Sequence, residues 1–82
     1  MKRTAGEVFG ERLRELRQKR GLTQVQLAER CDYPQARISE LERGARAPNL
    51  VTMLRLALAL ECKVSDLVSV FDKADIRPLL PK

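Results

Sequence analysis

The segment Gln35–Gly44 carries side chains whose types and spacing suit recognition chemistry. It reads QARISELERG, in which Ile38 and Leu41 are the only large apolar residues. Placed at 100° intervals around a helix, these two residues fall on one side. The opposite side carries small, hydroxyl and charged groups that can contact a polar surface. That side holds Ala36, Ser39, Glu40 and Arg43, with Gln35 and Glu42 at one edge and Arg37 at the other.

This division of a short helix suits insertion into the major groove of DNA. Such a helix needs a few apolar anchors to hold it, and hydrogen-bonding side chains near its N-terminal end that reach base edges. Ala36 would allow the backbone to approach closely or would contact a thymine methyl group. An ordinary solvated helix face would give the same stripe, so the stripe alone does not separate the two interpretations.

The composition argues against an enzyme. The chain has no histidine, which is the commonest general base and the commonest metal ligand. Glu40, Glu42 and Tyr33 form no acid–base pair with an orienting partner. Cys31 and Cys62 are too far apart for a CxxC zinc site, so we expect them to be buried or half-exposed thiols in a reducing compartment. We expect neither a metal nor a cofactor.

Length and charge indicate one small domain with a basic first part. The chain has 82 residues, which is enough for a single core. Residues 1–55 carry twelve Lys and Arg against seven Asp and Glu, whereas residues 56–82 carry four of each sign. A polyanion would therefore bind to the first two-thirds of the chain. No apolar run approaches the ~18 residues of a membrane span, so we expect a cytoplasmic protein that is at the nucleoid when bound to DNA.

Glycine and proline divide the chain into five short helical segments, and no segment alternates as a half-buried strand would. The first two helices begin with capping-box patterns, Thr4 with Glu7 and Thr23 with Gln26, and Asn49 is placed to cap the fourth. We expect an all-α domain over residues 1–72. The expected helices run from Thr4 to about Gly21, from Thr23 to Cys31, from Gln35 to Arg43, over residues 50–61 and over residues 64–71. Residues 73–82 are expected to be an extended or dimer-supporting tail.

The second and third helices have the features of a helix-turn-helix. Two or three residues join them, and both helices are too short to be stable outside a packed bundle. Gln24 lies at the start of the second helix, where free backbone N–H groups and an amide can bind a DNA phosphate. Arg43 and Arg46 bracket Gly44 in a loop that could straddle the sugar-phosphate backbone. Together these features favour DNA binding over an ordinary solvated face.

The chain resembles the phage repressor and Cro superfamily of helix-turn-helix regulators, also called xenobiotic-response-element-like. The resemblance is carried by RLRELRQKRGLTQVQLAER, by ISELERG, and by P, L, T and LRLALAL at the family's spacing, and it covers about residues 9–67. It implies a compact five-helix lambda-repressor-like domain that binds double-stranded operator DNA as a homodimer, with the third helix in the major groove. The function implied is a repressor or a self-regulating controller that binds a palindromic operator.

Matching positions give each polar residue an expected role. Base-edge contacts are expected from Gln35, Ala36, Arg37, Ser39 and Glu40. Phosphate contacts are expected from Thr23, Gln24, Arg43 and Arg46. Arg17 and Glu42 match an ion pair between the first and third helices in some members, and the helical wheel agrees because each lies about 75° from the core direction of its helix.

The chain departs from the family's usual residues at several positions. Asp32 stands where glycine is usual, Pro34 where a hydroxyl cap is usual, and Glu61 where glycine is frequent. Leu58 stands where the family often has a polar residue. Because one helix reads too few base pairs, two copies about 34 Å apart are the usual solution. We expect the interface between the copies to include Leu58, Val64, Val68, Phe71 and Ile76.

A second hypothesis comes from another class of protein. The apolar fourth and fifth helices and the DIRPLLPK tail could hold a partner protein, as in the antitoxin of a toxin pair, with DNA binding secondary. A tail that is protected only in a complex would favour this hypothesis.

Overall fold

Hydrogen-bonded caps start three of the helices at the residues that the sequence predicts. In this computed structural model, the Thr4 hydroxyl accepts from the Glu7 N–H at 3.1 Å, and the Thr4 N–H donates to the Glu7 carboxylate at 2.8 Å. Thr23 and Gln26 form the same reciprocal pair at the start of the second helix. The Asn49 side chain accepts from the Thr52 N–H at 2.8 Å. Each cap satisfies donors that a helix start leaves unpaired.

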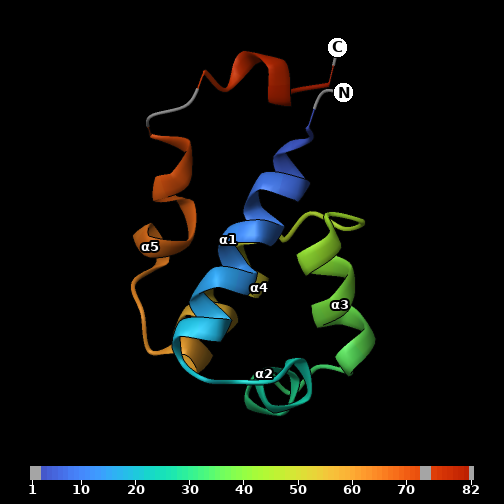
Figure 1. The fold of residues 1–82 in the computed structure, drawn as a ribbon, viewed down its shortest axis with the longest axis vertical. Helices are drawn as coiled ribbons and strands as arrows, with labels where there is room; N and C mark the ends of the chain where they lie inside the picture. Colours follow the sequence, from blue (N-terminus) through green and yellow to red (C-terminus); the bar gives the residue numbers. More distant parts are fainter. Residues whose placement is uncertain (1–2, 73–74, 82) are drawn as a thin grey trace.

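The structure describes residues 3–72 and 75–81, and the described residues form five α-helices without a strand. The predicted all-α fold is confirmed (Figure 1). The last helix is shorter than expected, since it passes into a 3₁₀ turn at Ser69. The helices are α1 (Ala5–Lys19), α2 (Gln24–Cys31), α3 (Gln35–Arg43), α4 (Leu50–Leu60) and α5 (Val64–Val68), followed by 3₁₀ turns at Ser69–Phe71 and Arg77–Leu79.

The turns that follow α2 and α4 have the left-handed geometry of a helix end, although Asp32 and Glu61 stand where glycine is usual or frequent. Asp32 and Glu61 each follow a helix in the left-handed region, with φ of 58° and 53°. In each case the next residue donates its N–H back into the helix, Tyr33 to Ala28 at 2.9 Å and Cys62 to Ala57 at 3.0 Å. Pro34 is extended and offers no side-chain cap, yet α3 still begins at Gln35.

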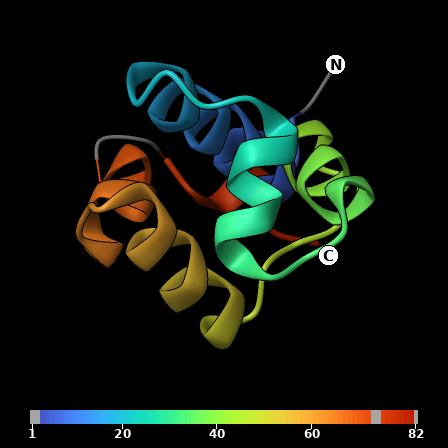
Figure 2. The same cartoon turned by 90° about the horizontal axis from the view of Figure 1, so that it is seen from below.

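One core holds the helices together, and every helix contributes to it. Ile38 and Leu41 of α3 are 0% and 1% exposed, so they anchor that helix as the wheel predicts. Burying a side chain of this size contributes roughly 1.5–3 kcal/mol. In Figure 2, α2 lies in the foreground with α3 on one side and α5 on the other. The fully buried large side chains are Leu13, Leu27, Ile38, Leu41, Leu56, Leu60 and Leu67.

Glycines let the backbones of α1 and α3 approach closely. A Cβ on Gly10 would lie 2.4 Å from the Glu42 carbonyl oxygen and 2.5 Å from that of Leu41. A Cβ on Gly44 would lie 2.7 Å from the Glu7 backbone nitrogen, and Gly44 also has a φ of 76°. The position of α3 is therefore set by its contact with α1 as well as by its apolar anchors.

The last described residues cross the end of the molecule opposite α2 (Figure 1). The turn at Arg77–Leu79 comes near the start of α1, and a shallow pocket separates residues 78–81 from residues 3–6. Residues 73–74 and 82 of the expected tail lie outside the described residues. The division into a domain over residues 1–72 and a tail stays a prediction.

Candidate nucleic-acid interface

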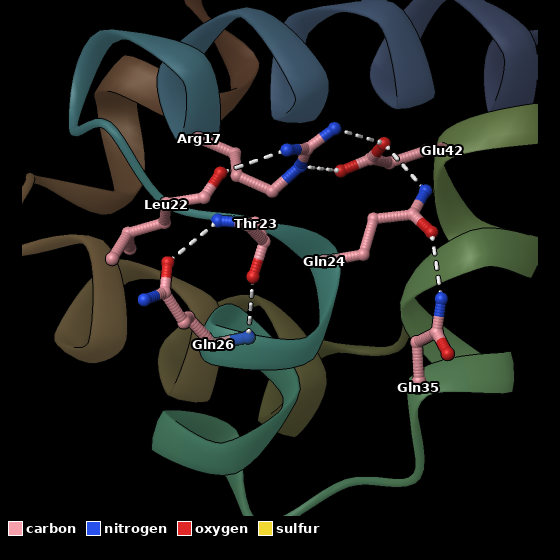
Figure 3. Close-up of polar contacts among 7 residues, drawn as sticks. All are labelled: Arg17, Leu22, Thr23, Gln24, Gln26, Gln35 and Glu42. Carbon is pink, nitrogen blue, oxygen red and sulfur yellow. Dashed lines mark hydrogen bonds and ion pairs between the residues drawn. The ribbon is translucent and has the colours of Figure 1, made fainter.

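A buried ion pair links α1 to α3 (Figure 3). The Arg17 Nε donates to one Glu42 carboxylate oxygen at 2.5 Å, and its Nη2 donates to the other at 3.0 Å. The remaining Arg17 nitrogen, Nη1, donates to the Leu22 carbonyl at 2.8 Å. The two charged side chains are only 11% and 3% exposed. Arg17 therefore holds both the carboxylate of α3 and the loop that precedes α2.

Gln24 extends this pair to the first residue of α3. The Gln24 Nε2 donates to the Glu42 carboxylate at 3.0 Å, and its Oε1 accepts from the Gln35 Nε2 at 3.2 Å (Figure 3). Because a carboxylate only accepts, this chain of bonds fixes the amide orientation of Gln24 and then that of Gln35. Within residues 3–72 and 75–81, Gln35 makes no other side-chain hydrogen bond, so its Oε1 and one N–H can supply the acceptor and donor pair that matches an adenine edge.

Thr23 and Gln24 form the start of α2. The Thr23 hydroxyl oxygen accepts from the Gln26 N–H, so its own proton remains available to a phosphate oxygen. The first backbone N–H groups of a helix lack helical partners and favour a nearby anion. Thr23 is exposed and Gln24 is half-buried. The arrangement is suited to a backbone phosphate at this helix start.

Three of the remaining polar residues of α3, Ser39, Glu40 and Arg43, are paired with the loop that follows the helix or with each other. The Arg43 Nη1 donates to the Ser39 hydroxyl at 2.8 Å, and the Arg46 Nε donates to the Glu40 carboxylate at 3.1 Å. Ala36 is exposed between Gln35 and Arg37. The structure thus brings a cation close to the one carboxylate of the outward face of α3.

The sequence assigns no DNA-binding role to Tyr33 or Arg55, yet both lie next to Arg37 or its stacking partner. The Arg37 guanidinium lies over the Tyr33 ring at 4.7 Å from its centroid, and the Arg55 guanidinium lies over the same ring at 5.5 Å. The spacing of four between Tyr33 and Arg37 is visible in the sequence. The contribution of Arg55 is not, because it comes from α4 across the fold.

The expected dimer residues differ in exposure. Leu58 is 82% exposed and Ile76 is 47% exposed. Three others, Val64, Val68 and Phe71, are half-buried against the core, so they complete the domain as well as border the surface. Sequence reasoning missed further exposed apolar residues of α4. Together with Leu58 they form a line that we call the α4 stripe, made of Leu50, Val51, Leu54 and Leu58.

The cysteines are free thiols. Cys31 is buried and Cys62 is half-buried, as expected. Burial raises the pKa of the Cys31 thiol, and the nearby Arg55 charge offsets part of that effect. Burial also raises the pKa of the Cys62 thiol. Both groups are therefore protonated at neutral pH, which makes them poor nucleophiles.

None of the helices in the described ranges is both long and apolar enough to cross a bilayer.

A protein-family model matches more than half of the chain. Residues 13–67 match the family described as helix-turn-helix, HTH_3. The matched range contains α2, the turn and α3, and it ends in α5.

Curated relatives include two regulators. The chain is 36% identical over 67 residues to an uncharacterized HTH-type transcriptional regulator, y4dJ, of Sinorhizobium fredii, and the match covers 82% of this chain and 87% of the relative. It is 39% identical over 59 residues to the immunity repressor protein of Bacillus phage phi105, which covers 72% of this chain. The chain spans only 41% of that repressor.

Solved structures with the same fold include two regulators. The restriction-modification controller protein C.AhdI of Aeromonas hydrophila superposes with a TM-score of 0.74 at 40% identity, over 76% of this chain and 94% of that one. The clp gene regulator ClgR of C. glutamicum gives a TM-score of 0.77 at 30% identity, over 84% and 92%.

Proposed function

The chain belongs to the helix-turn-helix family of DNA-binding transcriptional regulators, and we propose that it is a homodimeric repressor or self-regulating controller of a palindromic operator. It is a binding protein and not an enzyme. In this proposal α3 lies in the major groove, and the protein acts in the cytoplasm, at the nucleoid when bound to DNA. The observation that carries the proposal is the hydrogen-bonded chain Arg17–Glu42–Gln24–Gln35, which orients the first side chain of α3.

The proposed DNA contacts are of two kinds, contacts to base edges that read the sequence and contacts to phosphates that position the domain. Gln35 reads adenine through its free Oε1 and N–H, and Glu40 accepts from a cytosine amino group. Ala36, Arg37 and Ser39 complete the base-reading face. Phosphates are held by Thr23, Gln24, Arg43 and Arg46, which fix the register of the domain on the duplex.

The proposed dimer forms through the exposed apolar surface of α4 and its neighbours. Leu58 lies at its centre, since a leucine that is 82% exposed has no role in the core of this chain. The half-buried Val64, Val68 and Phe71 border that surface, and Ile76 of the last segment can extend it. A two-fold axis there would place two copies of α3 on one face of the duplex.

A selection of bound duplexes from random sequence, together with light scattering, tests this function. We expect a dimer and a selected site with two-fold symmetry. Gln35→Ala should relax the base preference at one position in each half-site. Arg46→Ala should lower the affinity for all sequences alike, and should reduce the slope of log affinity against log salt concentration by about one per half-site. The proposal would be contradicted if no sequence were enriched in the selection, or if the affinity for DNA did not fall between low and moderate salt concentration.

The α4 stripe also favours a second candidate function. In that function the stripe and the last segment bind a toxin or another partner protein, as an antitoxin does. The two candidates differ in solution. The regulator is a dimer by itself, so Leu54 and Leu58 should be protected from hydrogen exchange in the isolated protein. In the interaction module, Leu54, Leu58 and residues 75–81 should become protected only after a partner is added. Hydrogen exchange on the isolated protein separates them.

A further inference from the structure

Two guanidinium groups lie over the one tyrosine of the chain. Tyr33 occupies the turn between α2 and α3, and the Arg37 guanidinium carbon is 4.7 Å from its ring centroid. The Arg55 guanidinium carbon, from α4, is 5.5 Å from the same centroid. Both distances are within the range in which a cation is attracted to the face of an aromatic ring. The turn is therefore joined to α3 and to α4 through one side chain.

The Tyr33 ring is fixed from several sides. Its hydroxyl donates to the Thr52 hydroxyl at 3.2 Å, and Thr52 is itself only 6% exposed. The Tyr33 backbone N–H donates to the Ala28 carbonyl at the end of α2. The Arg55 Nη1 donates to the Cys31 carbonyl at 3.3 Å, which holds the second cation in place. A ring held in this way can act as a fixed platform for Arg37.

The stack leaves the hydrogen-bonding edge of Arg37 open. Stacking uses the flat face of a guanidinium, whereas guanine is read through the N–H groups at its edge. Arg43 and Arg46 contact Ser39 and Glu40, but in residues 3–72 and 75–81 no such hydrogen bond joins the Arg37 side chain to another group. A long side chain held on a platform loses less conformational freedom when it binds.

We propose that Tyr33 is a positioning residue for DNA recognition, which holds the Arg37 edge against a single guanine in each half-site. The proposal rests on the proposed function, since it names how one reading residue of that site is oriented. Its consequence is specific. Preference at the base that Arg37 contacts depends on the aromatic ring at position 33, while preference at the base that Gln35 contacts does not.

Selected DNA and a matched set of variants test the proposal. After selection with the wild-type protein, affinity is measured for the selected site and for a site changed at the Arg37-dependent base in both halves. Arg37→Ala should reduce that discrimination by about 5- to 100-fold, as expected for one bidentate pair. Tyr33→Leu should reduce it to the same level, and Tyr33→Phe should keep it because the ring remains.

The double variant and the Gln35 position separate positioning from general damage. Tyr33→Leu combined with Arg37→Ala should lose no more discrimination than Arg37→Ala alone, because both changes remove the same contact. Discrimination at the Gln35 base should stay at the wild-type level in all these proteins. Additive losses, equal losses at both bases, or full discrimination by Tyr33→Leu would each overturn the role of Tyr33.

A measurement on the wild-type protein covers the case in which Tyr33→Leu does not fold. The side-chain protons of Arg37 should show upfield ring-current shifts in the nuclear magnetic resonance spectrum, both in the free protein and in the complex with selected DNA. Ordinary shifts in the complex would overturn the proposal. Failure of the wild-type protein to select any sequence would instead overturn the function on which the proposal rests.

Discussion

Arg17 of α1 and Glu42 of α3 form a two-point ion pair that is almost completely shielded from water. The pair lies behind the outward face of α3, and its carboxylate also accepts from Gln24. A charge buried in this way is stable only with its partner, because removing one side leaves the other without compensation. The same pair therefore serves both the stability of the domain and the orientation of Gln35.

Removal of one partner should destabilise the domain strongly. We expect Glu42→Ala to lower the free energy of unfolding by about 3 kcal/mol, because Arg17 would remain buried and unpaired. Replacement of both residues, Arg17→Met with Glu42→Leu, should recover most of that stability but not the adenine preference at the Gln35 position. Thermal unfolding and DNA selection measure the two effects. Asp75→Asn, which breaks an exposed pair with Arg77, is the control and should leave the melting temperature unchanged.

Gly10 and Gly6 offer a matched test of the contact between α1 and α3. Gly10→Ala should cost about 1–3 kcal/mol and weaken DNA binding, because a Cβ there would meet backbone carbonyls at 2.4 Å and push α3 away. Gly6→Ala should cost less than Gly10→Ala, because its Cβ would meet the Gly44 backbone oxygen at 3.1 Å, which a shift of a few tenths of an ångström relieves, and because alanine favours the helix by about 1 kcal/mol. Equal denaturation midpoints for the two variants would show that the close approach is not required.

Glu61→Gly should stabilise the protein. Glu61 has a left-handed backbone that costs a residue with a Cβ about 1 kcal/mol or more, and glycine adopts it without that cost. We expect a gain of about 0.5–1 kcal/mol in chemical denaturation. Asp32→Gly should gain less, because aspartate tolerates this conformation better. The control is Glu29→Gly within α2, which should lose about 1 kcal/mol.

The Glu40–Arg46 contact should control base preference rather than stability. Glu40→Gln removes a carboxylate that is near DNA in the proposed complex and frees Arg46 for a phosphate, so affinity for unrelated duplexes should rise. The preference for cytosine at the Glu40 position should weaken at the same time. Binding curves on selected and random duplexes report both effects. An unchanged cytosine preference would remove Glu40 from the reading face.

Leu58 should be required for the dimer but not for the fold. Leu58→Glu should give a folded monomer in light scattering, because the side chain is 82% exposed in the single chain and its replacement leaves the core intact. Affinity for a palindromic site should fall towards that of one half-site. Leu58→Met keeps an apolar surface and should remain dimeric. A dimeric Leu58→Glu variant would place the interface elsewhere.

The sequence by itself determined the helices, their starts and the buried face of α3. These features depend on groups within a few residues of one another: Thr4 with Glu7, Thr23 with Gln26, and Ile38 with Leu41. Helical geometry fixes such short-range relationships before any tertiary contact forms. The basic, outward-facing character of residues 35–46 was visible for the same reason. The shortened α5 shows the limit of this reasoning, because hydrophobic spacing does not separate an α-helix from a 3₁₀ turn.

Apart from the Arg17–Glu42 pair, which the resemblance implied, only the tertiary structure decided which side chains of different helices are partners. Gln24 connects Glu42 to Gln35, and Arg55 reaches the ring of Tyr33, because neighbouring helices pack at particular axial positions and crossing angles. The position of α3 against α1 depends on the close approach at Gly10, which no local sequence pattern reveals. The same packing leaves the α4 stripe uncovered while it half-buries Val64 and Val68. Contacts between distant residues depend on the whole core. The sequence therefore identifies the candidate site residues, whereas the fold sets the orientation of their side chains.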